Sequence, residues 1–169
     1  SKSLSPTHPA FAIIGGAKFE TKVPIITLLL EKYDHTFVTG ALANDVFKAQ
    51  GLPVGRSLVS KELPDEAVIG HARFIAPTDV TAERSDGHAF VKRPHEVGVD
   101  DKIVDIGPDT VALLAPHIER AQFILWNGPT GLYEAGYTSH THALAELSAH
   151  RVQAGAHAVI GGGDTIAAL

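Results

Sequence analysis

Short apolar runs alternate with helix-like segments from one end of this chain to the other. Five runs have the character of buried strands and are mostly followed by glycine or proline: residues 11–16, 36–40, 73–81, 123–128 and 157–163. Helical spacing of apolar residues marks the segments between them: 23–33, 42–50, 109–121 and 139–153. In the first of these helices, Pro24 is expected near the first turn, where proline is tolerated.

Strands that alternate with helices in this way are joined by right-handed crossovers and form a parallel sheet covered on both faces. The pattern therefore predicts an α/β fold, a doubly wound, Rossmann-like parallel sheet in three α/β/α layers. The length of 169 residues fits a single domain over 1–169.

The composition excludes several classes of function. The chain has no cysteine, so disulfides, thiolate metal sites and cysteine nucleophiles are excluded. A net charge of -5 argues against nonspecific binding to nucleic acid or anionic membrane, so any phosphate site must be local. There is no signal-peptide pattern and no run near the ~18 apolar residues that a membrane span requires. We expect a soluble, cytoplasmic protein.

The segments that directly follow the apolar runs are the ones to read for chemistry, because ligands bind beyond the carboxyl ends of the strands in such a sheet. These segments are GGAKFETK, TGALA, PTD, WNGPTGLYE and GGGDT. We expect all five to lie on one rim of the sheet.

The last of these segments, GGGDT, has the features of a phosphate loop. Gly161, Gly162 and Gly163 allow close approach of the backbone, and the amides of a following helix attract anions. Asp164 suits a magnesium ion that bridges to phosphate, and Thr165 could add a hydroxyl. The alternative is that Asp164 only caps the helix.

The first segment, GGAKFETK, places two cations near the start of a helix. If that helix begins near Ala17, Lys18 and Lys22 lie on one face near its positive end, where an anion would favour them. A solvated lysine pair is the alternative. The sequence contains neither the GxxxxGK[ST] of a Walker P-loop nor the GxGxxG of a dinucleotide site.

The segment WNGPTGLYE combines a rigid turn, the amide of Asn127, and the group Leu132, Tyr133 and Glu134. Such a set could line a nucleotide base and hold ribose hydroxyls. Alternatively, Trp126 and Tyr133 are ordinary core aromatics.

Taken in order, GGAK, xGxxA, PxDV, DIGP, WNGPxG and GGGD resemble the carboxyl-terminal, nucleotide-binding half of phosphoglycerate kinase across essentially the whole chain. The resemblance implies a glycolytic kinase that moves a phosphoryl group reversibly between 1,3-bisphosphoglycerate and ADP, giving 3-phosphoglycerate and ATP. It also implies Mg²⁺ and ATP/ADP as ligands. Members of the family have two lobes that close on each other, and they are usually monomeric.

The resemblance also assigns roles to residues of this sequence. It places Lys18 near the transferring phosphoryl group and Lys22 on the phosphates of the nucleotide. The remaining nucleotide-binding residues that it implies are Gly16, Ala17, Gly40, Asn127, Gly128, Pro129, Tyr133, Glu134, Gly161, Gly162, Gly163, Asp164 and Thr165. Asp164 is the implied magnesium ligand.

The sequence departs from the family at several positions. Thr21 replaces a usual aspartate and Phe19 a common valine, while Thr39 and Ala41 replace part of a glycine run and could tighten the adenine pocket. A histidine-rich stretch, SHTHALAELSAH, replaces a more basic one. We expect its histidines (His140, His142 and His150) to lie on the surface rather than to bind metal.

Other parts of the family have no counterpart here. The amino-terminal lobe with the phosphoglycerate site is absent, as is the segment after GGGD that adds a final strand and an STGGG turn. Because phosphoryl transfer depends on positioning and charge stabilisation, we expect this chain to bind nucleotide without catalysing transfer. It could be a piece of an active enzyme, a stand-alone nucleotide-binding module, or a degenerate interaction module that keeps only the fold.

Overall fold

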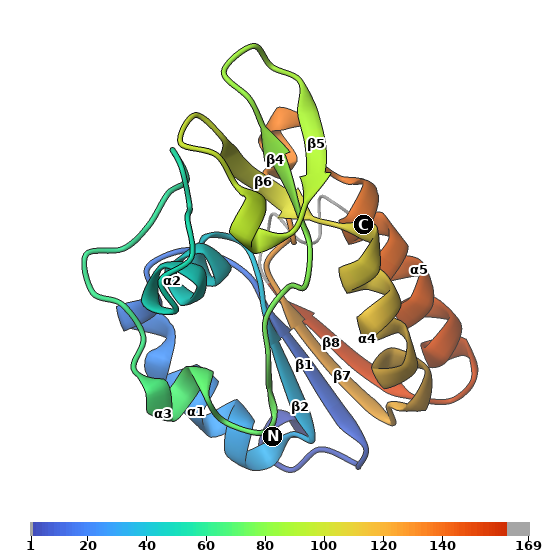
Figure 1. The fold of residues 1–169 in the computed structure, drawn as a ribbon. Helices are drawn as coiled ribbons and strands as arrows, with labels where there is room; N and C mark the ends of the chain where they lie inside the picture. Colours follow the sequence, from blue (N-terminus) through green and yellow to red (C-terminus); the bar gives the residue numbers. More distant parts are fainter. Residues whose placement is uncertain (1, 162–169) are drawn as a thin grey trace.

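The computed structural model describes residues 2–161, and a five-stranded parallel sheet forms its centre (Figure 1). The strand order is β3–β2–β1–β7–β8. The bounds are β1 Ala10–Ile14, β2 His35–Val38, β3 Phe74–Ile75, β7 Phe123–Asn127 and β8 His157–Gly161. Every neighbouring pair is parallel, which confirms the predicted sheet.

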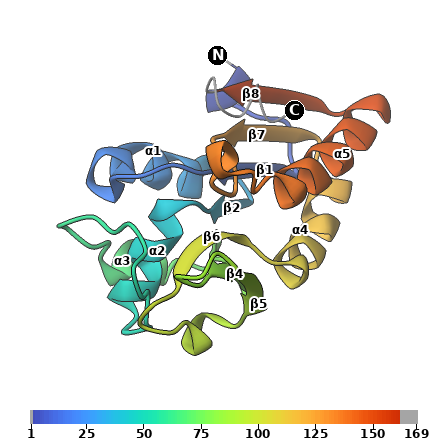
Figure 2. The same ribbon diagram turned by 90° about the horizontal axis from the view of Figure 1, so that it is seen from above.

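Helices cover both faces of this sheet, as the three-layer prediction requires (Figures 1 and 2). One face carries α1 Phe19–Lys32, α2 Ala41–Ala49 and α3 Glu66–Ile69, and the other carries α4 Pro108–Arg120 and α5 Ser139–Gln153. The short 3-10 helices are η1 Lys2–Leu4, η2 Pro94–Glu96 and η3 Tyr133–Ala135. None of the helices in the described part of the chain is long and apolar enough to cross a membrane.

Strand β1 shows why both faces must be covered. Its five residues are all buried, and alternate side chains of a strand point to opposite faces. Ala12 and Ile14 pack in the cluster that contains helix α1, whereas Phe11 and Ile13 pack in the cluster that contains α4 and α5. A run without polar alternation is what a central parallel strand requires.

Helix α1 starts four residues before the predicted start at Val23. Phe19 opens the helix and is 1% exposed, so burial of this ring holds the first turn against the core. Pro24 therefore lies inside the helix rather than near its first turn. Consequently Lys18 precedes the helix and Lys22 lies within it.

The predicted strand over 73–81 is wrong, because this run splits between two sheets. Phe74–Ile75 is β3 of the parallel sheet, and the chain then turns at Pro77 and enters β4, Val80–Glu83. Strand β4 is the centre of an antiparallel sheet with β5 Ala89–Lys92 and β6 Lys102–Ile106. This second sheet was not predicted from the sequence.

The second sheet packs against the parallel sheet's helical layer through α2. Ala43 and Phe47 of α2 form a buried cluster with Val80 of β4 and with Val97. The sheet therefore lies beside the carboxyl ends of β1 and β2 (Figure 2). It supplies a wall to the site described below.

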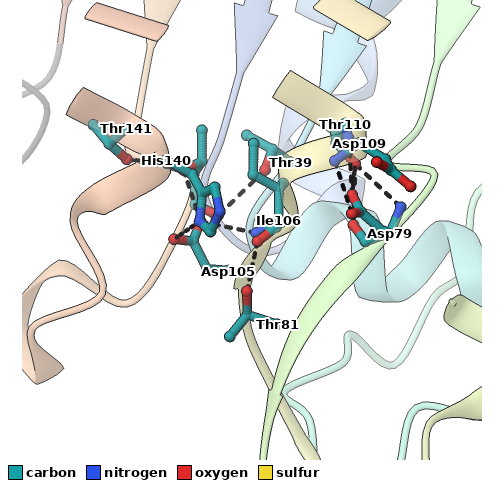
Figure 3. A network of polar contacts seen from close by, with 10 residues as sticks. Thr39, Asp79, Thr81, Asp105, Ile106, Asp109, Thr110, His140 and Thr141 are labelled. Atoms are coloured by element: carbon teal, nitrogen blue, oxygen red, sulfur yellow. Dashed lines mark hydrogen bonds and ion pairs between the residues drawn. The ribbon is translucent and has the colours of Figure 1, made fainter. Parts of the chain in front are cut away.

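Asp79, in the PTD segment, has a structural role. Its buried carboxylate accepts hydrogen bonds from the amides of Asp109 (2.9 Å) and Thr110 (2.8 Å) at the start of α4 (Figure 3). Its Oδ1 also accepts the hydroxyl of Thr110. Asp79 thus caps a helix from outside it, satisfying amides that would otherwise lack partners.

Candidate functional site

A cavity of about 230 Å³ opens at the carboxyl ends of the parallel strands. Its walls come from the turns after β1, β2 and β7, from helix α2, and from β6 of the second sheet. This is the edge at which ligands bind in open α/β sheets.

Three of these turns touch each other through their backbones. The amide of Gly15 donates to the carbonyl of Asn127 at 2.7 Å, and the amide of Leu42 donates to that of Gly16 at 3.0 Å. A Cβ at Gly15 would lie 2.5 Å from the carbonyl oxygen of Pro129. These contacts explain why glycines stand at the turns, because a side chain would separate them.

Two helices, α1 and α2, begin at the cavity. Within residues 2–161, their cap residues, Lys18 and Gly40, make no side-chain hydrogen bond to the helix, and the amide of Phe19 donates to Ser60 Oγ at 3.3 Å. The cap residue of α1 is Lys18, whose φ of 63° is a left-handed conformation that is costly for a residue with a side chain. A cation therefore stands at the start of α1, where the helix dipole favours a bound anion.

The opposite part of the cavity is apolar. Ala43 and Phe47 of α2 face Pro77, Val80 and Ile103 of the second sheet and the segment before it. An apolar wall of this kind fits a flat ring system such as a nucleotide base.

Six of the predicted residues line the cavity: Gly16, Ala17, Gly40, Pro129, Tyr133 and Glu134. Four others in the described structure do not line it: Lys18, Lys22, Asn127 and Gly128. Gly161, the end of β8, pairs with Asn127, so β8 ends next to the turn after β7. Gly162, Gly163, Asp164 and Thr165 lie outside the described residues.

The two aromatic residues of WNGPTGLYE differ in their surroundings, because one lies in the core and the other lines the cavity. Trp126 is fully buried in the core, and its indole nitrogen donates to the carbonyl of Gly128 at 2.7 Å. It is a core aromatic that also braces the turn. Tyr133 lines the cavity.

A buried polar network behind the cavity was missed by the sequence analysis. Asp105 of β6 accepts from Thr130 Oγ1 at 2.8 Å. Its other oxygen lies 2.9 Å from His140 Nδ1 (Figure 3). Thr130 in turn is 2.9 Å from Thr141 of α5, hydroxyl to hydroxyl. The DIGP motif contains Asp105, but sequence alone gave no signal of its partner in α5.

The expectation that His140 is a surface histidine is therefore wrong. Its side chain is 22% exposed and paired with a carboxylate that is 2% exposed. The hydrogen bond to Asp105 raises the pKa of His140 above its usual value, against the opposing effect of burial. His142 and His150 are exposed, as predicted.

A metal centre is not visible in the part of the chain that the structure describes. Among residues 2–161, no group of three or more histidine, aspartate or glutamate side chains could hold an ion. The predicted magnesium ligand, Asp164, is not among these residues.

A second cavity of about 220 Å³ lies at the other end of the parallel strands, where β1 and β2 begin. His117 of α4 stacks on Phe11, with centroids 5.6 Å apart, and lies 4.3 Å from the ring of His35. Burial lowers the pKa of both histidines, and repulsion from His35 and Arg120 lowers that of His117 further.

Comparison with known proteins extends the likeness over the whole chain. The family model of phosphoglycerate kinase matches residues 1–169. The phosphoglycerate kinase of Francisella tularensis subsp. novicida is 36% identical over 175 residues, which cover 98% of this chain and 44% of that protein. That of Zymomonas mobilis is 37% identical over 180 residues, covering 97% and 44%.

Solved structures give the same result. The structure of phosphoglycerate kinase from Coxiella burnetii matches with a TM-score of 0.87 and 36% identity, over 98% of this chain and 45% of that one. The enzyme from Pyrococcus horikoshii, 22% identical with a TM-score of 0.72, shares the fold. The chain thus spans a little under half the length of the relatives that it matches.

Proposed function

This chain belongs to the phosphoglycerate kinase family, and from that premise we propose that residues 1–169 are its nucleotide-binding lobe, with ADP or ATP held in the 230 Å³ cavity. The proposal rests on three glycine-containing turns that contact one another at the carboxyl ends of the parallel strands. They lie between an apolar part of the cavity wall and the starts of two helices.

The cavity suggests an orientation for the nucleotide. The base would lie against the apolar part of the cavity wall, to which Phe47 and Val80 contribute, where burial of a flat apolar surface is favourable. Tyr133 and Glu134 would stand at the ribose. The phosphates would then point toward Gly16 and the amides at the start of α1.

Lys18 and Lys22 would act at the phosphate end. Lys18, held in its left-handed conformation, would approach the transferring phosphoryl group, and Lys22, one turn into α1, would contact the other phosphates. Both act as positive charges that stabilise the equatorial oxygens during transfer.

We propose Asp164 as the residue that binds Mg²⁺, in the loop of Gly161, Gly162, Gly163 and Thr165. When bound, the ion would neutralise phosphate charge. What supports this proposal is that β8 ends at Gly161 beside Asn127, three residues before Asp164 in the sequence.

For the whole protein, the proposed reaction is the phosphoryl transfer of the family. The phosphoryl group leaves the acyl phosphate of 1,3-bisphosphoglycerate and joins the terminal phosphate oxygen of ADP, which yields 3-phosphoglycerate and ATP. The phosphoglycerate would be held by another lobe, so the chain by itself would bind nucleotide without turnover. Its proposed location is the cytoplasm.

A thermal titration tests this proposal. MgADP at millimolar concentration should raise the melting temperature of the chain, because a ligand that binds only the folded state stabilises it. Lys22→Ala should reduce the shift. A melting temperature that does not respond to MgADP in either protein would favour a module that keeps only the fold.

A further inference from the structure

His140 lies outside the cavity, yet it is connected to the cavity wall through one buried carboxylate. Asp105 Oδ2 accepts from His140 Nδ1, while Asp105 Oδ1 accepts from the hydroxyl of Thr130 and from the amide of Ile106. Both Asp105 and Thr130 line the cavity, and His140 does not. The carboxylate therefore joins α5 to the nucleotide site.

The wall held by Asp105 is the segment Thr130, Gly131 and Leu132. Thr130 is fixed on three sides: its hydroxyl by Asp105, its amide by Thr141 Oγ1 at 3.0 Å, and its carbonyl by Thr39 Oγ1 at 3.3 Å. A Cβ at Gly131 would lie 2.6 Å from Asp105 Cγ, so the wall rests directly on the carboxylate. Any movement of Asp105 is thus transmitted to the cavity.

A buried carboxylate needs a compensating charge or several donors to remain in place. Its side chain is 2% exposed, and within residues 2–161 His140 is the basic side chain that pairs with it. The groups that face His140 are Asp105 from β6 and Asp79 from the segment before β4. Nearby Tyr137 is engaged with Glu83 of β4.

We propose that His140 is a positioning residue of the nucleotide cavity, whose protonated ring fixes Asp105 and the Thr130–Leu132 wall and so makes nucleotide affinity depend on pH. This inference rests on the proposed nucleotide function and adds a means of regulating that site. A neutral ring loses the charge and can carry its single proton on either nitrogen, which weakens the hold on Asp105.

The sign of the pH dependence follows from the direction of the pKa. Because Asp105 raises the pKa of His140, the pairing is fully present below the usual histidine pKa and is lost as pH rises through the raised value. Nucleotide binding should accordingly be tighter on the acidic side of this range.

Calorimetric titration with MgADP tests the proposal on the wild-type chain, on His140→Asn and on His142→Asn. Asparagine can place an amide donor near the Nδ1 position but cannot be charged, and exposed His142 provides a control on the same helix. At about pH 6, the wild type should bind about fivefold tighter than His140→Asn, the difference between a charge-assisted and a neutral hydrogen bond. The ratio should approach one by about pH 8.5, and His142→Asn should follow the wild type.

Taking the ratio of variant to wild type cancels the titration of the nucleotide phosphates. A ratio that stays constant over this range, with wild-type binding intact, would overturn the role of His140 alone. Absence of MgADP binding in all three proteins would overturn the nucleotide function together with this inference.

A second measurement needs no ligand. The amide resonances of Gly131 and Leu132 in the free chain should titrate together with the imidazole of His140, and this titration should vanish in His140→Asn. Melting temperatures of the variants verify that they are folded. Amide resonances of Gly131 and Leu132 that stay constant while His140 titrates would contradict the proposed coupling.

Discussion

The Cβ position at Gly40 lies 2.9 Å from the amide nitrogen of Gly16, so the turns after β1 and β2 meet with no space for a side chain. Gly40 also has a φ of +69°, which other residues rarely adopt. The contact is between two backbones, which cannot yield as a flexible side chain could. It fixes the floor of the proposed nucleotide site.

Replacing Gly40 should therefore lower the free energy of unfolding by more than backbone strain alone would. Gly51 provides a control, since its φ is +80° but nothing lies within 4 Å of its Cβ position. We expect Gly51→Ala to cost about 1–2 kcal/mol of unfolding free energy. Gly40→Ala should cost about 2–5 kcal/mol, because overpacking adds to the strain, and should abolish the MgADP shift in melting temperature. Equal losses in denaturant titrations would show that the two turns can separate freely.

Lys18 should show a conflict between stability and binding. Its left-handed backbone is unfavourable for lysine but not for glycine, so Lys18→Gly should raise the unfolding free energy by about 1 kcal/mol. Loss of the cation should weaken MgADP binding about tenfold. Lys32→Ala, at the other end of the same helix, removes the same charge and should leave binding unchanged. If Lys18→Gly bound MgADP normally, Lys18 would have no role at the phosphates.

Asp79 should matter for stability and little for binding, although it follows a strand at the ligand edge. Asp79→Ala leaves the amides of Asp109 and Thr110 without their acceptor and should cost about 1–2 kcal/mol. Asp79→Asn keeps one acceptor oxygen and should cost less. Chemical denaturation gives both values, and calorimetry should find near-normal MgADP affinity for the folded variants. A large loss of affinity in Asp79→Asn would place this residue in the site instead.

The cavity between Phe11, His35 and His117 should destabilise the chain in acid. Burial lowers the pKa of both histidines, so they favour the folded state above the usual histidine pKa and lose this contribution as pH falls through the lowered values. His117→Phe keeps a ring to stack on Phe11 and removes one titrating group. Between about pH 7 and 5, its urea midpoint should fall less than that of the wild type. Exposed His142→Phe is the control and should fall as the wild type does.

The parallel sheet could be predicted because its signals are local. Central strands such as β1 and β7 are continuous apolar runs, and α5 is found at the predicted residues 139–153. The glycine turns were also visible, because a glycine after an apolar run indicates a close approach of backbone.

The second sheet and the polar network could not be predicted, because both depend on contacts between distant residues. Strand β5 is mostly exposed and β4 is only half-buried along its length, so neither gives a clear hydrophobic pattern. The split of 73–81 is determined by pairing of β4 with β5 and β6. Likewise, His140 is a helix residue whose burial depends on Asp105, 35 positions earlier.

The central claim is that nucleotide binds at the carboxyl edge of the parallel sheet, and an amide NMR titration with MgADP tests it most directly. Changes in amide chemical shift should concentrate on Gly16, Gly40 and the Thr130–Glu134 segment. The amide chemical shifts of Asp34 and Arg120, at the other end of the parallel strands, should stay unchanged. No shifts at millimolar MgADP, or shifts centred on Asp34 and Arg120, would contradict the assignment of this cavity as the nucleotide site.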